Sequence, residues 1–563
     1  MILSLEQMQI VFSDAPIIFI EALAGTGKTT TLAEFSKERS DENILYLVFN
    51  SKNRKEARFK FPKNVTVHTI NNFVFNLTKN SFTNHIINEY SISFLIKNLP
   101  KLKALPQDDA IIKAVTITEI VNSFFDSPFK ESQFFLDKDE EEWALAHEFI
   151  EKINNVPNFP LTHNVLLKKF LDTFNFNSLK YDTVLVDEAQ DLSLPMLNII
   201  NKINAKKVFV GDIRQAIYGF RRTVNVFTRS DIDAQRLKLT KSYRFGSEIA
   251  AFVNAVCEKM YKEPLNLQGA SKESGELVLN ENVFMKGPYS AFITRTNAYL
   301  FDKAFSLMKD EVLISIPFDW DEVKSMLMDV FYLKIGLKGK VVNKKFKDYE
   351  NFEYMKKIAQ SGGDVEISYL IKVVEKYGLD LPENISTLER YLSSPKKADI
   401  ILLTAHKSKG LEFKHVFLIN LTASAWDGSG GPNTLTLPLN LEVIGDARNT
   451  QDGKKRLLFV AITRAAKTLT MTSPRYADDA EKENKPLSFL DEKVIQIDDQ
   501  LYISSPFIPT GRVIEHNETL SDDEKVSAMR RIWLNKLLDP SEKIEPLLKE
   551  RVKDFRLSAS HIS

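Results

Sequence analysis

Short apolar runs, each followed by polar residues, recur along this 563-residue chain and predict the strands of a buried sheet. Examples are "IIFI" at 17–20, "TVLV" at 183–186 and "KVFV" at 207–210. Apolar runs of this length are typical of parallel strands that are covered on both faces. Longer stretches with helical spacing, such as "SISFLIKNLPKLKAL" and "EEEWALAHEFIEKIN", predict a helical insertion at 76–164. The pattern therefore favours an α/β fold.

The run at 17–20 leads into "ALAGTGKT" at 22–29 and then into a helical segment. Strand, glycine-rich loop and helix occur in the order of a phosphate-binding loop, which argues against a chance glycine turn. Lys28 would bring a positive charge to the β- and γ-phosphates, and the Thr29 hydroxyl is suited to bind Mg²⁺. The predicted nucleotide-binding residues here are Ala22, Leu23, Ala24, Gly25, Thr26, Gly27, Lys28, Thr29 and Thr30.

The run at 183–186 delivers Asp187 and Glu188 to the carboxyl end of a predicted strand, the edge at which parallel sheets bind ligands. One carboxylate can hold Mg²⁺, and its neighbour can orient or deprotonate an attacking water molecule. We predict that Asp187 holds the metal and that Glu188 is the base, and the exchanged assignment stays open. A solvated acidic turn is the alternative, but the apolar strand before it argues against that interpretation.

Composition limits the remaining possibilities. Lys+Arg and Asp+Glu are both 75, which argues against a globally basic nucleic-acid binder but not against a local groove. A single cysteine, Cys257, excludes a disulfide framework or a cysteine-based zinc site, so we expect no structural metal. The N-terminus lacks the pattern of a secretion signal and no window approaches 18 apolar residues. We therefore expect no membrane span, and a cytoplasmic location, or a nuclear one in a eukaryote.

Further segments occur in a fixed order. They are "LEQMQ" at 5–9, "VLVDEAQD", "VFVGDIRQAIYGFRR", "LTKSYRFGSEIA", "AFITRTNAYL", "TAHKSKGLEF" and "RLLFVAITRA". With the phosphate loop, this series resembles superfamily 1 DNA helicases of the UvrD/Rep/PcrA group, from Gln9 to about Thr472. Within that group the chain looks most like the F-box-type DNA helicases, although no F-box is recognisable in it.

The resemblance implies roles for particular residues in an ATP site shared by two lobes. Gln9 would read the adenine, Tyr243 would stack on it and Glu412 would contact the ribose. Gln215 would sense the γ-phosphate, and two arginines would reach it. The implied catalytic residues are Lys28, Asp187, Glu188, Gln215, Arg244 and Arg464.

The resemblance also implies a path for DNA. The expected DNA-binding residues are Lys52, Thr69, Tyr218, Phe220, Arg221, Asn297 and His406. Aromatic rings can stack on bases without reading them, but the chain has 39 phenylalanines, and Phe220 could equally be core packing. The basic segment 337–347 could hold phosphates or be a solvated loop, and both interpretations stay open.

The implied architecture has two RecA-like motor lobes, at 1–75 with 165–248 and at 249–310 with 395–475. Helical insertions are expected at 76–164 and, in reduced form, at 311–394, with a C-terminal extension of unknown role at 476–563. The implied function is an ATP-driven helicase that moves 3′ to 5′ on single-stranded DNA and unwinds tailed duplexes, in repair or recombination control. Two alternatives remain: an ATP-switched nucleic-acid-binding regulator that docks a protein partner through the extension, and an ATPase that acts on RNA.

Overall fold

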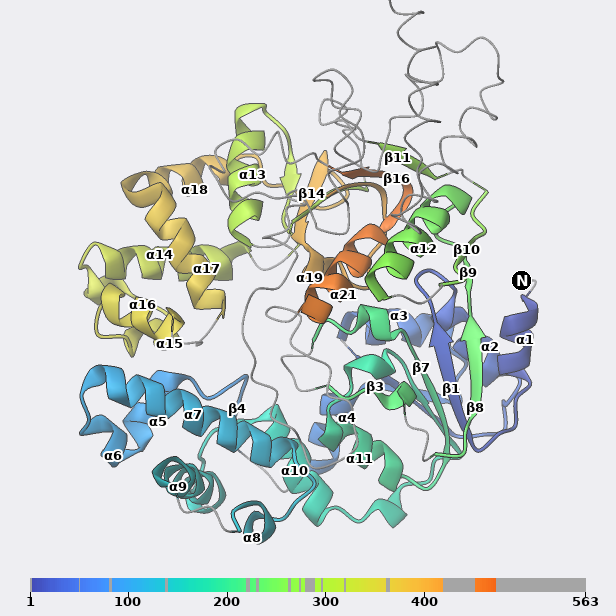
Figure 1. The fold of residues 1–563 in the computed structure, drawn as a ribbon, viewed down its shortest axis with the longest axis horizontal. Coiled ribbons are helices and arrows are strands. Elements are labelled where there is room, and N and C mark those ends of the chain that lie inside the picture. The colour runs from blue at the N-terminus through green and yellow to red at the C-terminus, as the bar shows by residue number, and fades with distance from the viewer. Residues whose placement is uncertain are drawn as a thin grey trace, which may run out of the picture.

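The computed structural model contains two six-stranded parallel sheets with helices packed against them (Figure 1). It describes residues 3–49, 51–79, 84–136, 140–218, 223–228, 232–261, 265–272, 275–278, 289–294, 297–317, 320–360, 365–418 and 451–471. The predicted α/β class is confirmed. Within these ranges, no helix combines the length and the apolar character that crossing a bilayer requires. The expected extension at 476–563 lies outside the described residues.

The first sheet has the strand order β3-β2-β6-β7-β1-β8. Its strands are β1 (Ile17–Ala22), β2 (Ile44–Val48), β3 (Val65–Thr69), β6 (Thr183–Val186), β7 (Lys206–Gly211) and β8 (Gln235–Leu239). The three apolar runs of the sequence are β1, β6 and β7. Because all the strands are parallel, the segments that follow them meet at one edge of the sheet.

Alternate side chains of these strands fill two cores. One core contains Ile18, Tyr46 and Leu185, and it lies under α1 (Leu5–Val11), α2 (Lys28–Lys37) and α3 (Ser51–Lys60). The other contains Phe19, Leu45 and Val184, and it packs against α4 (Ile70–Thr78), α10 (His163–Thr173) and α11 (Leu194–Lys202). Burial on both faces explains why the inner strands β2 and β6 are uncharged runs. The edge strands β3 and β8 carry polar residues that are partly exposed.

The second sheet has the order β11-β16-β15-β12-β14-β13. Its strands are β11 (Glu276–Val278), β12 (Ser290–Thr294), β13 (Ile314–Ser315), β14 (Ile400–Thr404), β15 (Phe413–Leu418) and β16 (Ala465–Met471). Helices α12 (Ser247–Tyr261), α19 (Ala405–Ser408) and α21 (Gln451–Ile462) share its core. Leu23 and Ile217 of the first lobe belong to the same apolar cluster, so the two lobes pack directly on each other.

Two groups of helices extend from the lobes. The first comprises α5 (Ile92–Asn98), α6 (Pro100–Lys103), α7 (Gln107–Asp126), α8 (Glu131–Phe134) and α9 (Glu141–Asn155), and it is flanked by the short parallel strands β4 (Ile86–Ile87) and β5 (Leu161–Thr162). The second follows α13 (Asn297–Lys309) and comprises α14 (Trp320–Lys334), α15 (Lys344–Lys347), α16 (Phe352–Gln360), α17 (Val365–Tyr377) and α18 (Leu381–Glu389).

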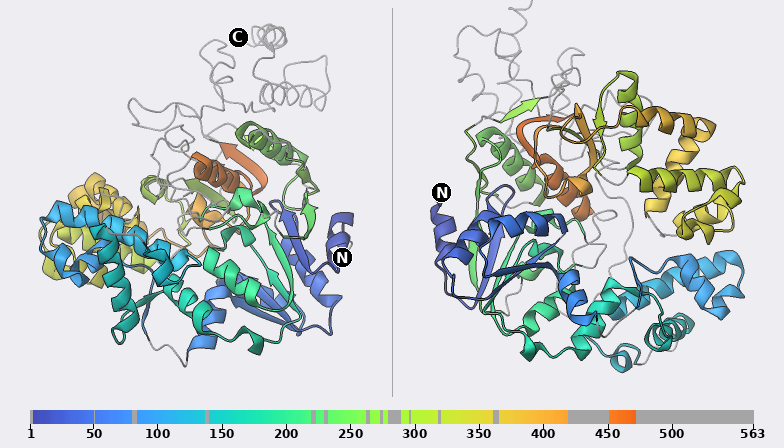
Figure 2. Two further views of the ribbon diagram at one scale, coloured as in Figure 1. Left: turned by 60° about the horizontal axis from the view of Figure 1, so that its bottom comes forward. Right: turned by 180° about the vertical axis from the view of Figure 1, so that it is seen from behind.

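The two groups lie on the same side of the molecule, away from α1 (Figures 1 and 2). They meet through the ion pairs Lys97–Asp348, at 3.8 Å, and Lys357–Asp108, at 2.8 Å. All four side chains are at least 42% exposed, so these pairs contribute little stability. Buried apolar residues of both groups also belong to one hydrophobic cluster.

Candidate active site

The glycine-rich loop lies between the end of β1 and the start of α2. Gly25 and Gly27 have φ angles of +75° and +80°, where any other residue would strain the backbone. A Cβ atom added to Gly25 would lie 2.5 Å from the Ser242 hydroxyl oxygen, and one added to Gly27 would lie 3.1 Å from the amide nitrogen of Gln7. Gly27 is also the N-cap of α2, so the helix N-terminus opens onto the loop. The loop is therefore a narrow cradle suited to an anion.

Two carboxylates follow β6 and are held separately. Oδ2 of Asp187 accepts a hydrogen bond from the Tyr46 hydroxyl at 2.8 Å. Glu188 has a φ of 53°, a left-handed conformation that turns the chain. Its carboxylate lies 3.8 Å from Nζ of Lys28 and accepts a hydrogen bond from the Gln190 amide. Different partners thus fix the two acids in different places, as two different roles would require.

The surroundings shift the pKa values of these acids in opposite directions. Burial and the adjacent Glu188 carboxylate raise the pKa of Asp187, and Lys28 offsets this only in part. Burial also opposes ionisation of Glu188, but the charges of Lys28 and Lys409 outweigh it and lower the pKa of Glu188. The protein itself therefore keeps Glu188 ionised, which is the state that a base needs.

Oxygen atoms suited to a divalent cation gather around Tyr46. Its hydroxyl donates to Asp187 and also interacts with the Thr29 hydroxyl. The two potential metal ligands, Asp187 and Thr29, therefore both lie next to the Tyr46 hydroxyl. A carboxylate and a hydroxyl are the hard oxygen donors that Mg²⁺ prefers. A nearby cation would also lower the raised pKa of Asp187. These residues therefore fit Mg²⁺.

Two arginines lie at the junction of the lobes, next to this site. Arg464 is 1% exposed, and its guanidinium donates to Oε1 of Gln215 at 3.2 Å. Arg244 donates to the Glu412 carboxylate at 3.1 Å and to the Thr463 carbonyl at 2.8 Å. Burial, together with the charge of Arg244, lowers the pKa of Arg464 well below its ordinary value. The guanidinium groups of Arg244 and Arg464 lie near each other at the junction of the lobes, and their positive charges favour binding of an anion there.

Lys409, which follows α19, carries another positive charge across the junction. Its side chain is 6% exposed, and its ammonium donates to the Asp191 carboxylate and, at 2.6 Å, to the Gln215 carbonyl. The same nitrogen lies 3.7 Å from the Glu188 carboxylate and 5.1 Å from the centroid of the Tyr218 ring. A single side chain thus connects the acids of the site with an aromatic residue expected to bind DNA.

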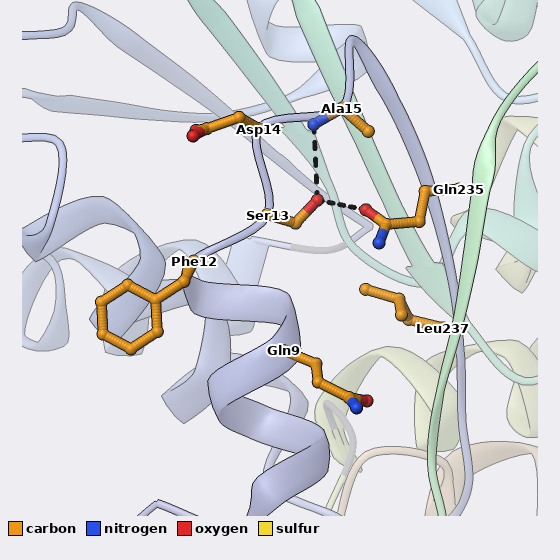
Figure 3. Close-up of a pocket in the computed structure, with 7 residues that line it drawn as sticks. All are labelled: Gln9, Phe12, Ser13, Asp14, Ala15, Gln235 and Leu237. Carbon is orange, nitrogen blue, oxygen red and sulfur yellow. Dashed lines mark hydrogen bonds between the residues drawn. The ribbon is translucent and has the colours of Figure 1, made fainter.

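The expected base-reading glutamine does not lie at this site. Gln9 is exposed at a surface pocket near the amino-terminal ends of β1 and β8, lined also by Phe12, Ser13, Asp14, Ala15, Gln235 and Leu237 (Figure 3). Gln7 is 4% exposed and lies beside Gly27, as does the ring of Tyr243. The structure therefore places Gln7, and not Gln9, beside the phosphate loop. The two positions face opposite ways because residues two apart on a helix differ by about 200°.

A stacked pair of aromatic rings lies on the other side of Lys409. The ring centroids of Phe49, which follows β2, and Tyr218 are 4.9 Å apart, and their planes are inclined by 22°. The Lys409 ammonium lies 5.9 Å from the Phe49 centroid. Sequence reasoning missed Phe49, although an aromatic residue directly after a buried strand was a usable signal. Rings of this kind can stack on nucleic-acid bases.

Comparison with known protein families gives two matching models. The model of the UvrD/REP helicase N-terminal domain matches residues 3–231, and that of the UvrD-like helicase C-terminal domain matches residues 340–476. The chain belongs to the UvrD-like helicase family. The matched regions contain each of the predicted catalytic residues except Arg244, which lies between them.

Two relatives of this UvrD-like helicase are F-box DNA helicases. F-box DNA helicase 1 of Gallus gallus is 26% identical over 506 residues, which cover 81% of this chain and 47% of the relative. F-box DNA helicase protein 1 of Schizosaccharomyces pombe is 25% identical over 607 residues, which cover 96% of this chain and 67% of the relative. The chain therefore spans about half of the chicken protein and two thirds of the yeast protein.

The other expected DNA-binding residues of the UvrD-like helicase are placed in part. The Thr69 hydroxyl caps α4 by accepting a hydrogen bond from the Asn72 backbone at 3.2 Å. His406 lies half-buried on α19. Lys52 and Asn297 lie on α3 and α13, but their side chains are outside the described part of the structure, as are Phe220 and Arg221 entirely.

Proposed function

We propose that this chain is an ATP-dependent DNA helicase that moves 3′ to 5′ on single-stranded DNA and separates the strands of tailed duplexes, in repair or recombination control. The contact between Arg464 and Gln215 carries the proposal, because it brings a second-lobe cation to the edge of the sheet that holds Lys28. A triphosphate on the loop would then interact with both lobes, so hydrolysis would change how they pack. The direction of movement rests on family resemblance alone.

In this proposal each group has a separate role in hydrolysis. Lys28 and the loop N–H groups hold the phosphates. Thr29 and Asp187 would hold Mg²⁺, which when bound supplies charge neutralisation at the phosphates. Glu188 takes the proton of the attacking water, and Arg464 stabilises the charge that develops in the transition state. Gln215, held between the lobes, orients the reacting groups.

The nucleoside would lie beside Gly27. The Gln7 amide can both donate to and accept from the edge of an adenine, and the Tyr243 ring, 45% exposed, offers a face for stacking. Glu412 is now bonded to Arg244. When that arginine moves to a phosphate, the carboxylate becomes free for the ribose hydroxyls.

Single-stranded DNA would pass over Phe49 and Tyr218. Stacking of a base on an aromatic ring contributes about 1–3 kcal/mol and does not depend on base identity. Lys409 touches this aromatic pair and the carboxylates of the nucleotide site, and it thereby couples the two.

The test uses the purified chain and Lys28→Ala as the matched inactive control. ATP turnover is measured without nucleic acid, with single-stranded DNA and with RNA of the same sequence, over a range of salt. Strand separation is measured on duplexes with a 3′ tail, a 5′ tail or no tail. We expect stimulation by DNA that declines with salt, because phosphate binding releases counterions. We also expect unwinding of the 3′-tailed duplex, with both activities lost in the control.

Other outcomes separate the alternatives. Turnover that DNA does not stimulate at any salt concentration, without strand separation, would favour the ATP-switched regulator. Equal or greater stimulation by RNA would move the substrate to RNA. Unwinding of the 5′-tailed duplex alone would reverse the polarity, and normal turnover by Lys28→Ala would overturn the nucleotide site itself.

A further inference from the structure

The side-chain amide of Gln215 is held at both ends, and its orientation is therefore determined. Nε2 of Gln215 donates to Oδ2 of Asp212 at 2.9 Å, while Oε1 accepts from Arg464 at 3.2 Å. If the bond to Asp212 were lost, the amide could rotate and present its NH₂ group to the arginine, and two donors would then face each other. The position of Asp212 thus decides which end of Gln215 faces the second lobe.

Asp212 is a fully buried carboxylate whose negative charge needs a positive charge or hydrogen-bond donors nearby. It is 0% exposed, and Oδ1 accepts from the backbone N–H of Arg214 at 3.1 Å. A guanidinium nitrogen of Arg214 lies 3.6 Å from the same oxygen, and the arginine side chain is 12% exposed. A buried carboxylate without a nearby cation is strongly unfavourable, so the guanidinium of Arg214 stabilises Asp212 in the place where it holds Gln215.

Arg214 also contacts the strand that delivers the phosphate loop. The same guanidinium nitrogen donates to Oε1 of Glu21 at 2.7 Å. Glu21 directly precedes Ala22, the last residue of β1, and pairs in register with Gly211 of β7. Burial opposes ionisation of Glu21, but the hydrogen bond and charge of Arg214 outweigh it, and the pKa of Glu21 is lowered. The ion pair therefore ties the ends of β1 and β7 together.

We propose that Arg214 is a positioning residue for Gln215: it fixes Asp212 and joins this segment to the phosphate-loop strand through Glu21, so that the loop and Gln215 respond to the γ-phosphate as one unit. The inference rests on the proposed function, since it assigns the positioning of a glutamine at that site. Arg214 itself does not touch substrate. It acts on the reaction through the position of Gln215, and its bond to Glu21 anchors it to the strand that leads into the loop.

The experiment compares Arg214→Met with Lys238→Met as a matched control. Lys238 also faces Glu21, at 3.6 Å, but its side chain is 71% exposed. We expect Arg214→Met to lower the DNA-stimulated kcat about tenfold or more, as loss of a charged hydrogen bond would. The KM for ATP should change by less than about threefold, because the phosphate contacts remain. Lys238→Met should retain the kcat of the parent.

Two further variants keep the test decisive. Arg214→Lys retains the charge but cannot span both carboxylates as the guanidinium does, so it should fold normally, by its melting temperature, and recover part of kcat. The double variant Arg214→Met/Gln215→Ala should be no slower than Gln215→Ala alone, because both changes remove the same positioned amide.

The proposal would be refuted if the fold-loss of kcat in Arg214→Met/Gln215→Ala equalled the product of the losses in the two single variants. Arg214 would then act independently of Gln215. The proposal would also be refuted if Arg214→Lys had the kcat of the parent while Arg214→Met had a lowered melting temperature. The ion pair of Arg214 would then serve only the stability of the fold. Failure of the parent protein to hydrolyse ATP would refute the proposed function. Hydrolysis by the parent with no effect of Arg214→Met would refute this inference alone.

Discussion

Replacing Lys409 with methionine should uncouple ATP hydrolysis from DNA while ATP binding persists. The change keeps the length and apolar stem of the side chain but removes the ammonium that bonds Asp191 and the Gln215 carbonyl. Lys409 belongs to the second lobe and both partners belong to the first. The lost interaction therefore weakens the packing between the lobes, and each lobe retains its own core.

The burial of the ion pair between Lys409 and Asp191 determines how large the loss of free energy should be. The side chains of Lys409 and Asp191 are 6% and 0% exposed. Removing one partner of a buried ion pair costs about 3–5 kcal/mol, because the remaining charge loses its compensation. If the closed arrangement of the lobes is the one that hydrolyses ATP, a loss of about 3 kcal/mol lowers its population, and hence the DNA-stimulated kcat, about 100-fold.

The assay measures DNA-stimulated turnover, the dissociation constant for a fluorescent ATP analogue and the melting temperature. Lys407→Met is the matched control, because Lys407 lies on the same short helix with an exposed side chain. The double variant Lys409→Met/Asp191→Asn should recover part of the rate, since it removes the uncompensated charge as well. A DNA-stimulated kcat of Lys409→Met within about threefold of the parent would refute the reasoning, because the buried pair would then contribute nothing to the active arrangement.

The remaining predictions concern single steps of the proposed cycle. Glu188→Gln should keep ATP binding and lower turnover by about 10²–10⁴-fold, as loss of a general base does; a collapse of ATP affinity would show instead that Glu188 binds the metal. Phe49→Ala and Tyr218→Ala should each weaken single-stranded DNA binding by about 1–3 kcal/mol and leave DNA-free turnover unchanged, and wild-type DNA affinity and unwinding would mark both rings as core packing. Gln7→Ala should raise the KM for ATP, whereas Gln9→Ala should not, and the opposite result would restore the original assignment.

The parts of the site that lie close together in the sequence could be predicted from it. The run "IIFI" at 17–20 and the loop that follows it are local, so strand, cradle and Lys28 were all predictable. The same holds for Asp187 and Glu188 at the end of β6. In each case a buried strand fixes the direction of the chain. The residues that follow the strand therefore lie at the carboxyl edge of the sheet.

The failures have physical causes too. Gln9 and Gln7 are both glutamines on one helix, and only Gln7 shares the buried face with Ile10 and Val11. A five-residue motif does not show which face of a helix is buried. The bond between Lys409 and Asp191 joins positions 218 residues apart. Such a pairing depends on how two lobes pack, and no local pattern specifies it.

Three of the contacts that join the lobes around the nucleotide site are polar, so a bound phosphate could replace one partner in each. Arg464 to Gln215, Arg244 to Glu412 and Lys409 to Asp191 are all hydrogen bonds or ion pairs with one charged partner or two. A phosphate oxygen can replace the acceptor in such a bond at similar strength, about 1.5–3 kcal/mol for a charged hydrogen bond. An apolar contact offers no such replacement. In the proposed cycle the bonds that are lost and gained have similar free energies. A nucleotide of modest affinity would then be enough to shift the lobes between two arrangements, and loss of the γ-phosphate would shift them back.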